Sequence, residues 1–204
     1  MGVVAHPTDA AAQEGYWANR LTLSLASGPT LPTWDEMKVM TGGRFTGSYG
    51  LEDAVDGRLA GELTAGAWVV LQNLDSGSWE GPTVIYVHPG LRGRLLDGPF
   101  TPFAALHVGL DINRAAYVDG GTNDVGFGFD TTIGVELVPV GWFDVELFVS
   151  YHVTTNCPIP RDGGENGAAG FFILGVGLGV SIPGGEGPQG APSPGQGRAP
   201  IGPS

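Results

Sequence analysis

The chain has 204 residues, enough for one domain or two very small ones, and its formal net charge is −12. This acidic balance excludes nucleic acid as a partner, because 9 basic residues against 21 acidic ones leave no basic surface for phosphates. Charged residues are 15% of the chain, against about 25% in ordinary soluble domains. The hydrophobic share of 42% argues against wholesale disorder.

Most of the sequence alternates between bulky apolar residues and small or polar ones, the period of two that is typical of half-buried strands. Pro89 lies inside the fourth alternating segment, where we expect a β-bulge because proline cannot donate a ladder hydrogen bond. In chain order the predicted strands are residues 20–25, 43–51, 57–71, 83–95, 104–113, 125–137, 143–153 and 172–182.

The predicted connections alternate between short turns and longer polar loops. The short turns are 51–57, 96–100 and 138–142, and the longer loops are 27–42, 72–82, 113–124 and 154–168. Thr33 is placed to cap a helical turn within the first loop. Eight antiparallel strands joined in this way predict an all-β fold, an up-and-down barrel.

The alternating pattern divides the chain into three parts. We expect a flexible N-terminal segment over residues 1–15, a β-barrel domain over 16–182 and a disordered Pro/Gly-rich tail over 183–204. The tail has no strict three-residue glycine repeat, which excludes collagen. Residues 1–7 lack the basic and apolar regions of a signal peptide, so we expect a secreted form to be the mature one with Met1 added.

The bulky apolar face of nearly every predicted strand would overfill the narrow interior of an eight-stranded barrel. Turned outward, the same face would meet lipid, and segments of about 9–11 residues are long enough to cross a bilayer. We therefore predict a transmembrane barrel, with a soluble ligand-binding barrel as the alternative. The predicted lipid-facing residues are Leu106, Val108, Leu110, Val145, Leu147, Val176 and Leu178. Aromatic residues expected at the membrane interfaces are Phe100, Trp142, Phe143, Tyr151, Phe171 and Phe172.

The opposite face of the strands then points into the lumen. The predicted lumen network comprises Arg58, Glu62, Tyr86, His88, Arg92, Arg94, His107, Asp111, Asp130, Glu136, Asp144, Glu146 and His152. Charges of both signs are present, so we expect ion pairs and hydrogen bonds that plug the barrel. A proton or ion path, or a catalytic cluster, is the alternative reading.

Three stretches, residues 84–92, 98–103 and 148–152, resemble small outer-membrane β-barrel proteins of Gram-negative bacteria, the OmpA/OmpX-like barrel superfamily. The resemblance spans roughly residues 16–182. It implies an integral membrane protein of the bacterial outer membrane, with both termini of the barrel on the side of the short turns, which is the periplasm. It also implies a structural or interaction role through the long loops or the tail, with membrane lipid and a further membrane or periplasmic protein as partners.

A second resemblance suggests an enzyme. Residues 152–156 resemble the His-x-Ser element of outer-membrane lipid A deacylases, with Thr154 in place of the serine. A hydroxyl two residues from His152 would lie on the same strand face, as activation of a nucleophile requires. The segment 170–182 carries no carboxylate to orient the histidine, so we expect no catalysis and keep a lipid hydrolase as the alternative.

Metal and cofactor sites are not indicated by the sequence. Residues 119–124 and 162–166 are rich in oxygen ligands suited to Ca²⁺, but they lack EF-hand spacing and read more simply as turns. Cys157 is the single cysteine, which excludes an intramolecular disulfide and a cysteine-based metal cluster. We therefore expect no bound metal and no cofactor.

Overall fold

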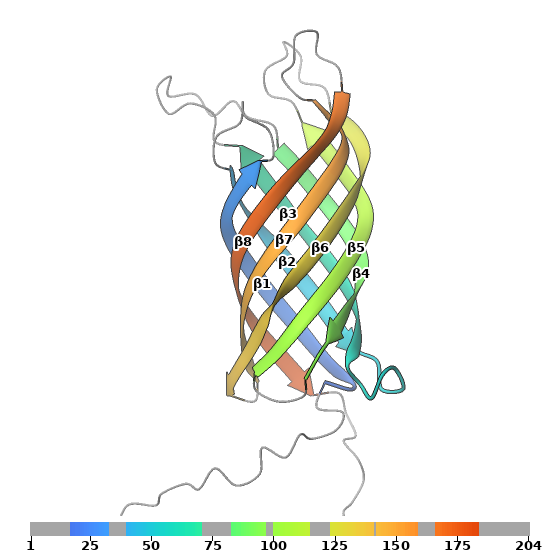
Figure 1. The fold of residues 1–204 in the computed structure, drawn as a ribbon, viewed down its shortest axis with the longest axis vertical. Helices are drawn as coiled ribbons and strands as arrows, with labels where there is room; N and C mark the ends of the chain where they lie inside the picture. Colours follow the sequence, from blue (N-terminus) through green and yellow to red (C-terminus); the bar gives the residue numbers. More distant parts are fainter. Residues whose placement is uncertain are drawn as a thin grey trace, which may run out of the picture.

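The computed structural model describes residues 17–32, 40–70, 83–96, 100–114, 123–140, 142–158 and 166–183. These residues form eight antiparallel strands that close into one barrel in simple chain order (Figure 1). The strands are β1 (Arg20–Pro32), β2 (Met40–Gly50), β3 (Leu59–Val70), β4 (Thr83–Arg94), β5 (Phe100–Arg114), β6 (Asn123–Val140), β7 (Phe143–Pro158) and β8 (Asn166–Pro183). The all-β, up-and-down barrel predicted from the alternation is confirmed. This part of the chain contains no helix that is long and apolar enough to cross a membrane.

The barrel is closed by pairing between β1 and β8. Arg20 is opposite Pro183, and Pro32 is opposite Phe171. The first residue of β1 and the last residue of β8 therefore meet at one end of the barrel, which also holds the short turn between β2 and β3 (bottom of Figure 1). The expected helical turn at Thr33, the calcium-type loops and the tail after Pro183 lie largely or wholly outside the described residues.

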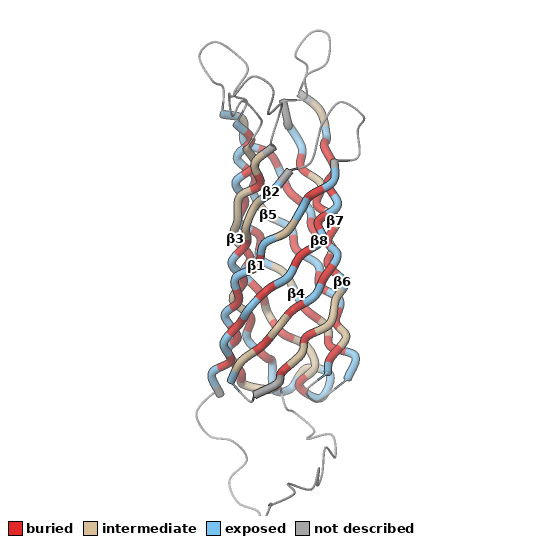
Figure 2. Tube along the Cα trace, turned by 90° about the vertical axis from the view of Figure 1, so that its left-hand side faces the viewer, coloured by how far each residue is buried: buried red, intermediate tan, exposed pale blue. Residues whose placement is uncertain are grey.

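Buried and exposed residues alternate along most of each strand (Figure 2), as expected where one face lines the lumen and the other forms the outer surface. The polarity of the two faces is inverted relative to a water-soluble barrel. Among the described residues, 25 buried ones are polar or charged and 13 are hydrophobic. Bulky apolar residues such as Leu110 and Leu178, each more than half exposed, cover the outside instead.

The expected bulge at Pro89 is wrong. Leu63 pairs with Pro89 in the same register as the rest of the β3–β4 ladder. On the other edge, Val87 pairs with Leu110 and Gly90 with His107, so the register is equal on both sides of the proline. Strand β4 therefore accommodates the missing donor without inserting an extra residue.

The true irregularities lie elsewhere. The β6–β7 register shifts between Leu137 and Val140, and the β7–β8 register shifts between Thr154 and Cys157. Both positions are near strand ends, where a bulge disturbs few cross-strand contacts.

One aromatic residue expected at the interface lies in the lumen. Phe171 is fully buried, whereas its neighbour Phe172 is exposed on the outer surface. Adjacent residues of a strand point to opposite faces, so both could not belong to the outer girdle. Phe171 packs instead near His152, at 6.1 Å between ring centroids.

Close packing inside the barrel depends on glycine at selected positions. A Cβ atom at Gly175 would lie 2.0 Å from the ring of Phe148. The β8 glycine therefore leaves the space that the β7 aromatic ring fills. The glycine-rich inner face of β8 is explained by this packing.

Candidate functional site

The candidate site is the lumen, where charged side chains from several strands meet without contact with solvent. Among the described residues the buried charges comprise six carboxylates and four guanidinium groups. These are Glu62, Asp111, Asp130, Glu136, Asp144 and Glu146, with Arg20, Arg44, Arg92 and Arg94. Such charges are tolerated when they are paired and hydrogen-bonded.

Arg92 of β4 is the centre of the half of the lumen nearer the short turns. Its Nε lies 2.6 Å from Glu62 Oε1 of β3, and its Nη1 contacts both Glu136 of β6 and Glu146 of β7. Arg94 Nε donates to Glu136 Oε2 at 2.7 Å. A planar guanidinium suits this arrangement, because its several N–H groups can donate to carboxylates from different strands at once.

Aromatic rings complete this half of the lumen. The guanidinium carbon of Arg44 lies 3.7 Å from the ring centroid of Phe148, and that of Arg92 lies 4.0 Å from the ring of Phe103. At the turn end, Arg94 lies over the ring of Trp17, at 4.1 Å, and Trp17 is 1% exposed. These contacts hold the cations in fixed positions and fill the space around them.

His107 of β5 connects the two halves of the lumen. Its Nε2 lies 2.8 Å from Glu62 Oε2, and its Nδ1 lies 3.3 Å from Asp130 Oδ1. Asp130 also accepts hydrogen bonds from Thr132, at 2.8 Å, and from Ser150, at 2.5 Å. The carboxylate of Asp130 therefore contacts three neighbouring side chains, from β5, β6 and β7.

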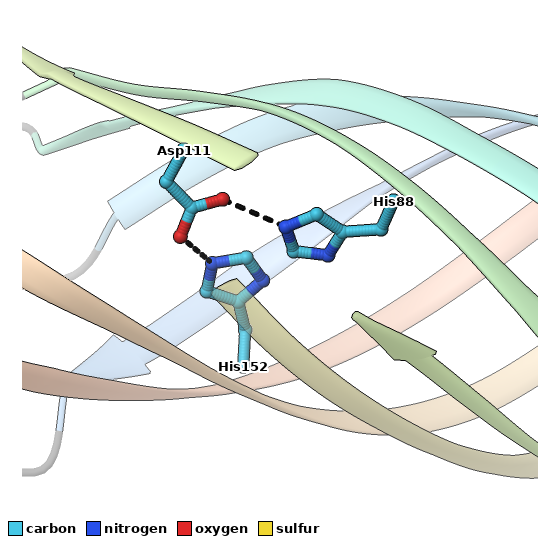
Figure 3. A group of neighbouring side chains, drawn as sticks. All are labelled: His88, Asp111 and His152. Carbon is cyan, nitrogen blue, oxygen red and sulfur yellow. Dashed lines mark hydrogen bonds and ion pairs between the residues drawn. The ribbon is translucent and has the colours of Figure 1, made fainter. Parts of the chain in front are cut away.

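Two further histidines share one carboxylate in the half nearer the longer connections (Figure 3). His88 Nε2 lies 2.7 Å from Asp111 Oδ1, and His152 Nε2 lies 3.2 Å from Asp111 Oδ2. The two imidazole rings are nearly parallel, at 8°, with centroids 5.2 Å apart. Tyr86 packs against both rings, at 5.0 and 5.2 Å.

The predicted lumen residues are buried in this network, with one exception. Arg58 is half-buried and lies in the turn before β3, which begins at Leu59 and not at residue 57. Its carbonyl oxygen accepts a hydrogen bond from the backbone N–H of Arg94. Arg58 therefore lies in a turn, and its predicted position within a strand is wrong.

Arg44 is a lumen residue that the sequence prediction missed, and the buried Arg20 is a second one. Arg44 donates to Thr132 Oγ1 at 3.2 Å and lies 3.9 Å from Glu146. The signal was present, because Phe45 and Tyr49 define the outer face of the segment 43–51 and period two then places Arg44 on the inner face.

The weak catalytic candidates are both inside the lumen. Thr154 Oγ1 donates to Asn113 Oδ1 at 3.2 Å, and His152 contacts Asp111. Neither side chain is exposed.

The predicted lipid-facing residues lie on the outer surface. Six of them are 48–56% exposed: Leu106, Val108, Leu110, Leu147, Val176 and Leu178. Val145 is half-buried and alternates with the inward Asp144 and Glu146. An apolar surface that continues around a barrel is unsuited to water and suited to lipid.

Comparison with known proteins identifies the fold. No protein-family model matches the sequence, and no curated protein matches it. Neisserial surface protein A (NspA) is similar, at 10% identity and a TM-score of 0.57, over 79% of this chain and 95% of that chain. The N-terminal β-barrel domain of OprF from Pseudomonas aeruginosa gives 10% identity and a TM-score of 0.53, over 81% and 98% of the two chains.

Ail, the attachment invasion locus protein of Yersinia pestis, is a third similar structure. It gives 11% identity and a TM-score of 0.52, over 81% of this chain and 99% of that chain. Identities this low bear on the fold alone. The chain therefore has the fold of these small eight-stranded β-barrels, as the resemblance in its sequence implied, and its outer surface is apolar.

Proposed function

We propose that this barrel spans the bacterial outer membrane with a closed lumen, and that it acts without catalysis in a structural or interaction role. The long connections or the tail 183–204 would carry that role. The supporting observation is the contact of Arg92 with three carboxylates from three different strands. A cation held in this way occupies the cross-section that a channel would need.

Both ends of the described lumen also carry a large aromatic side chain. Trp17 lies at the turn end beneath Arg94, and Trp68 lies near the other end, stacked 6.0 Å from Tyr86. Each tryptophan is 1% exposed. This packing favours a plug over a path for ions.

The connections that follow β1, β3, β5 and β7 all start at one end of the barrel, because successive strands are antiparallel. Binding residues are often found on loops held by a rigid scaffold. The name of Ail, the attachment invasion locus protein, describes an interaction role for a barrel with this fold. We assign the same class of role to the present chain.

The lipid hydrolase alternative is less well supported. A nucleophile needs a base within hydrogen-bonding reach, whereas Thr154 bonds to Asn113 and His152 bonds to Asp111. Both residues lie inside the barrel wall, while acyl chains would lie outside it. The soluble carrier alternative conflicts with the apolar outer surface.

Conductance measurements test the closed lumen. The refolded barrel in a planar bilayer should give no steady ion current, whereas Arg92→Ala combined with Arg94→Ala should open transient currents. Steady channels in the wild type would overturn the plug. In a parallel assay, acyl release from lipid A that disappears in His152→Ala would replace the proposal with a hydrolase.

Crosslinking in intact native cells tests the interaction role. Variants with residues 71–82 or 184–204 replaced or removed should still assemble as barrels, and one of them should lose a crosslinked partner that the wild type retains. Wild-type barrels that crosslink to no protein or surface glycan would contradict the role.

A further inference from the structure

We propose that His88, Asp111 and His152 form a binding site for one divalent transition-metal ion inside the lumen. The residues come from β4, β5 and β7, and their potential ligand atoms all lie within 4.8 Å of one another. The inference is independent of the proposed structural or interaction role, and it replaces our expectation from the sequence that no metal is bound.

The donor set fits the chemistry of such ions. Imidazole nitrogen suits zinc, copper, nickel and iron, and two histidines with one carboxylate are a common combination for them. The Nε2 atoms of both histidines point at the two oxygens of Asp111 (Figure 3). All three side chains are completely buried, so an ion held by them would be shielded from bulk solvent.

The charge balance of the lumen leaves room for a dication. The six buried carboxylates exceed the four buried guanidinium groups by two negative charges in the described barrel. Buried charges must be compensated, either by protonated histidines or by a bound cation. One divalent ion would supply both missing charges beside Asp111, whose ion-pair partners among the described residues are His88 and His152. The neighbouring Asp130 also pairs only with histidines in this part of the chain.

A carboxylate lies near the second ring nitrogen of His152, although it does not yet accept a hydrogen bond from it. A metal on Nε2 places the ring proton on Nδ1, and His152 Nδ1 lies 3.9 Å from Asp130 Oδ2. Ligating histidines usually present this second nitrogen to a carboxylate or carbonyl, which fixes the ring. A small movement of the ring toward Asp130 would complete that contact.

Gly128 of β6 keeps the space beside the ligand atoms open. A Cβ atom there would lie 2.2 Å from His88 Nε2 and 2.5 Å from Asp111 Oδ1. Any larger residue would therefore displace the atoms that would ligate the ion. Three protein ligands leave one position of a tetrahedral ion for a water molecule or a further ligand.

Metal counting on the full chain tests the proposal. The protein is refolded with Zn²⁺ or Co²⁺, freed of loose metal by a chelator, and analysed by elemental mass spectrometry. We expect roughly one ion per folded chain, and a visible absorption spectrum of tetrahedral type with Co²⁺. The double variant His88→Gln/His152→Gln should lose the ion and the spectrum.

His107→Gln is the matched control. His107 is also a buried lumen histidine bonded to carboxylates, Glu62 and Asp130, but it lies outside the proposed ligand set. This variant should keep the ion. Folding of every variant is checked by heat-modifiable migration in gels, which separates closed barrels from unfolded chains.

Each outcome decides the question. If wild-type barrels retain no metal, the proposed site is wrong, and protonated histidines supply the two missing positive charges. Equal binding by the double variant places the ion elsewhere and also overturns it. If the double variant does not fold, Cu²⁺ bound to the wild type decides: coupling to two imidazole nitrogens in the paramagnetic resonance spectrum supports the site, and its absence refutes it.

Discussion

Replacing Leu147 by arginine tests whether the outer surface of the barrel faces lipid. Leu147 is 48% exposed, and its cross-strand neighbours are Val135 on β6 and Val176 on β8. An arginine there would stand in a continuous apolar surface. In water this change would cost little, because the side chain would extend into solvent.

The size of the effect follows from the position of Leu147 between the aromatic residues of β7. Phe143 and Tyr151 each lie four residues away, in opposite directions. With a rise of about 3.3 Å per residue and a strand tilt of about 40°, four residues span roughly 10 Å along the membrane normal. Leu147 is then near the middle of an apolar band about 25 Å tall, where an arginine costs about 2–4 kcal/mol.

Urea titration of the barrel in lipid vesicles measures this cost. Leu147→Arg should shift the folding equilibrium by roughly 30- to 1,000-fold. Tyr151→Arg is the matched control, because the same charge near the interface costs about 0–1 kcal/mol. Equal losses at both positions, or no loss at Leu147, would refute the assignment of this surface to the bilayer core.

Further predictions concern the lumen and the chain end. Arg92→Met should destabilise the barrel by about 3–5 kcal/mol in urea titrations, because it leaves its buried glutamate partners uncompensated; an unchanged midpoint would contradict the network. Gly175→Val should cost about 1–3 kcal/mol by displacing Phe148, whereas Gly61→Ala, with open space around its Cβ, should leave the midpoint unchanged. Deleting residues 184–204 should alter neither the midpoint nor the gel migration, since β8 closes the barrel at its last residue; a lost barrel would show that the tail is needed for folding.

The fold was predictable because its signal is local. Alternation along a strand such as β5, where buried His107 and Asp111 flank exposed Val108 and Leu110, is visible within a few residues of sequence. The choice between a soluble and a membrane barrel was also predictable. It depends on which face is bulky and which is small or charged, and period two assigns the faces without any knowledge of pairing.

The sequence predictions were wrong where the chemical type of one residue was given more weight than the alternation of its strand. Phe171 and Phe172 were both assigned to the interface from their aromatic character, although adjacent residues must diverge. Pro89 was assigned a bulge from its missing donor, although the ladder keeps its register there. Arg58 was placed in a strand because the predicted segment begins at residue 57, whereas β3 begins at Leu59. In each case the period-two alternation of the strand was correct, and the error lay in the assignment made for one residue.

The contacts of the lumen could not be predicted, because they depend on strand register. His88, Asp111 and His152 are separated by 23 and 41 residues, which match no metal-ligand spacing in sequence. Only the pairing of β4 with β5, together with the curvature of the wall, brings them together. The same holds for Arg92, whose glutamate partners lie on three strands.

The contacts inside the lumen explain why its buried cations are arginines and not lysines. The chain contains a single lysine, Lys38, while its buried cations in the described barrel are all arginines. A lysine ammonium is a compact, strongly hydrated charge, whereas a guanidinium offers donors in several directions and stacks on aromatic rings. Arg92 uses both properties at once, bonding to carboxylates of three strands while its plane covers Phe103. A lysine could satisfy fewer of these carboxylates and would lose the stacking. The inside of the barrel therefore favours arginine, because one side chain must contact carboxylates of several strands.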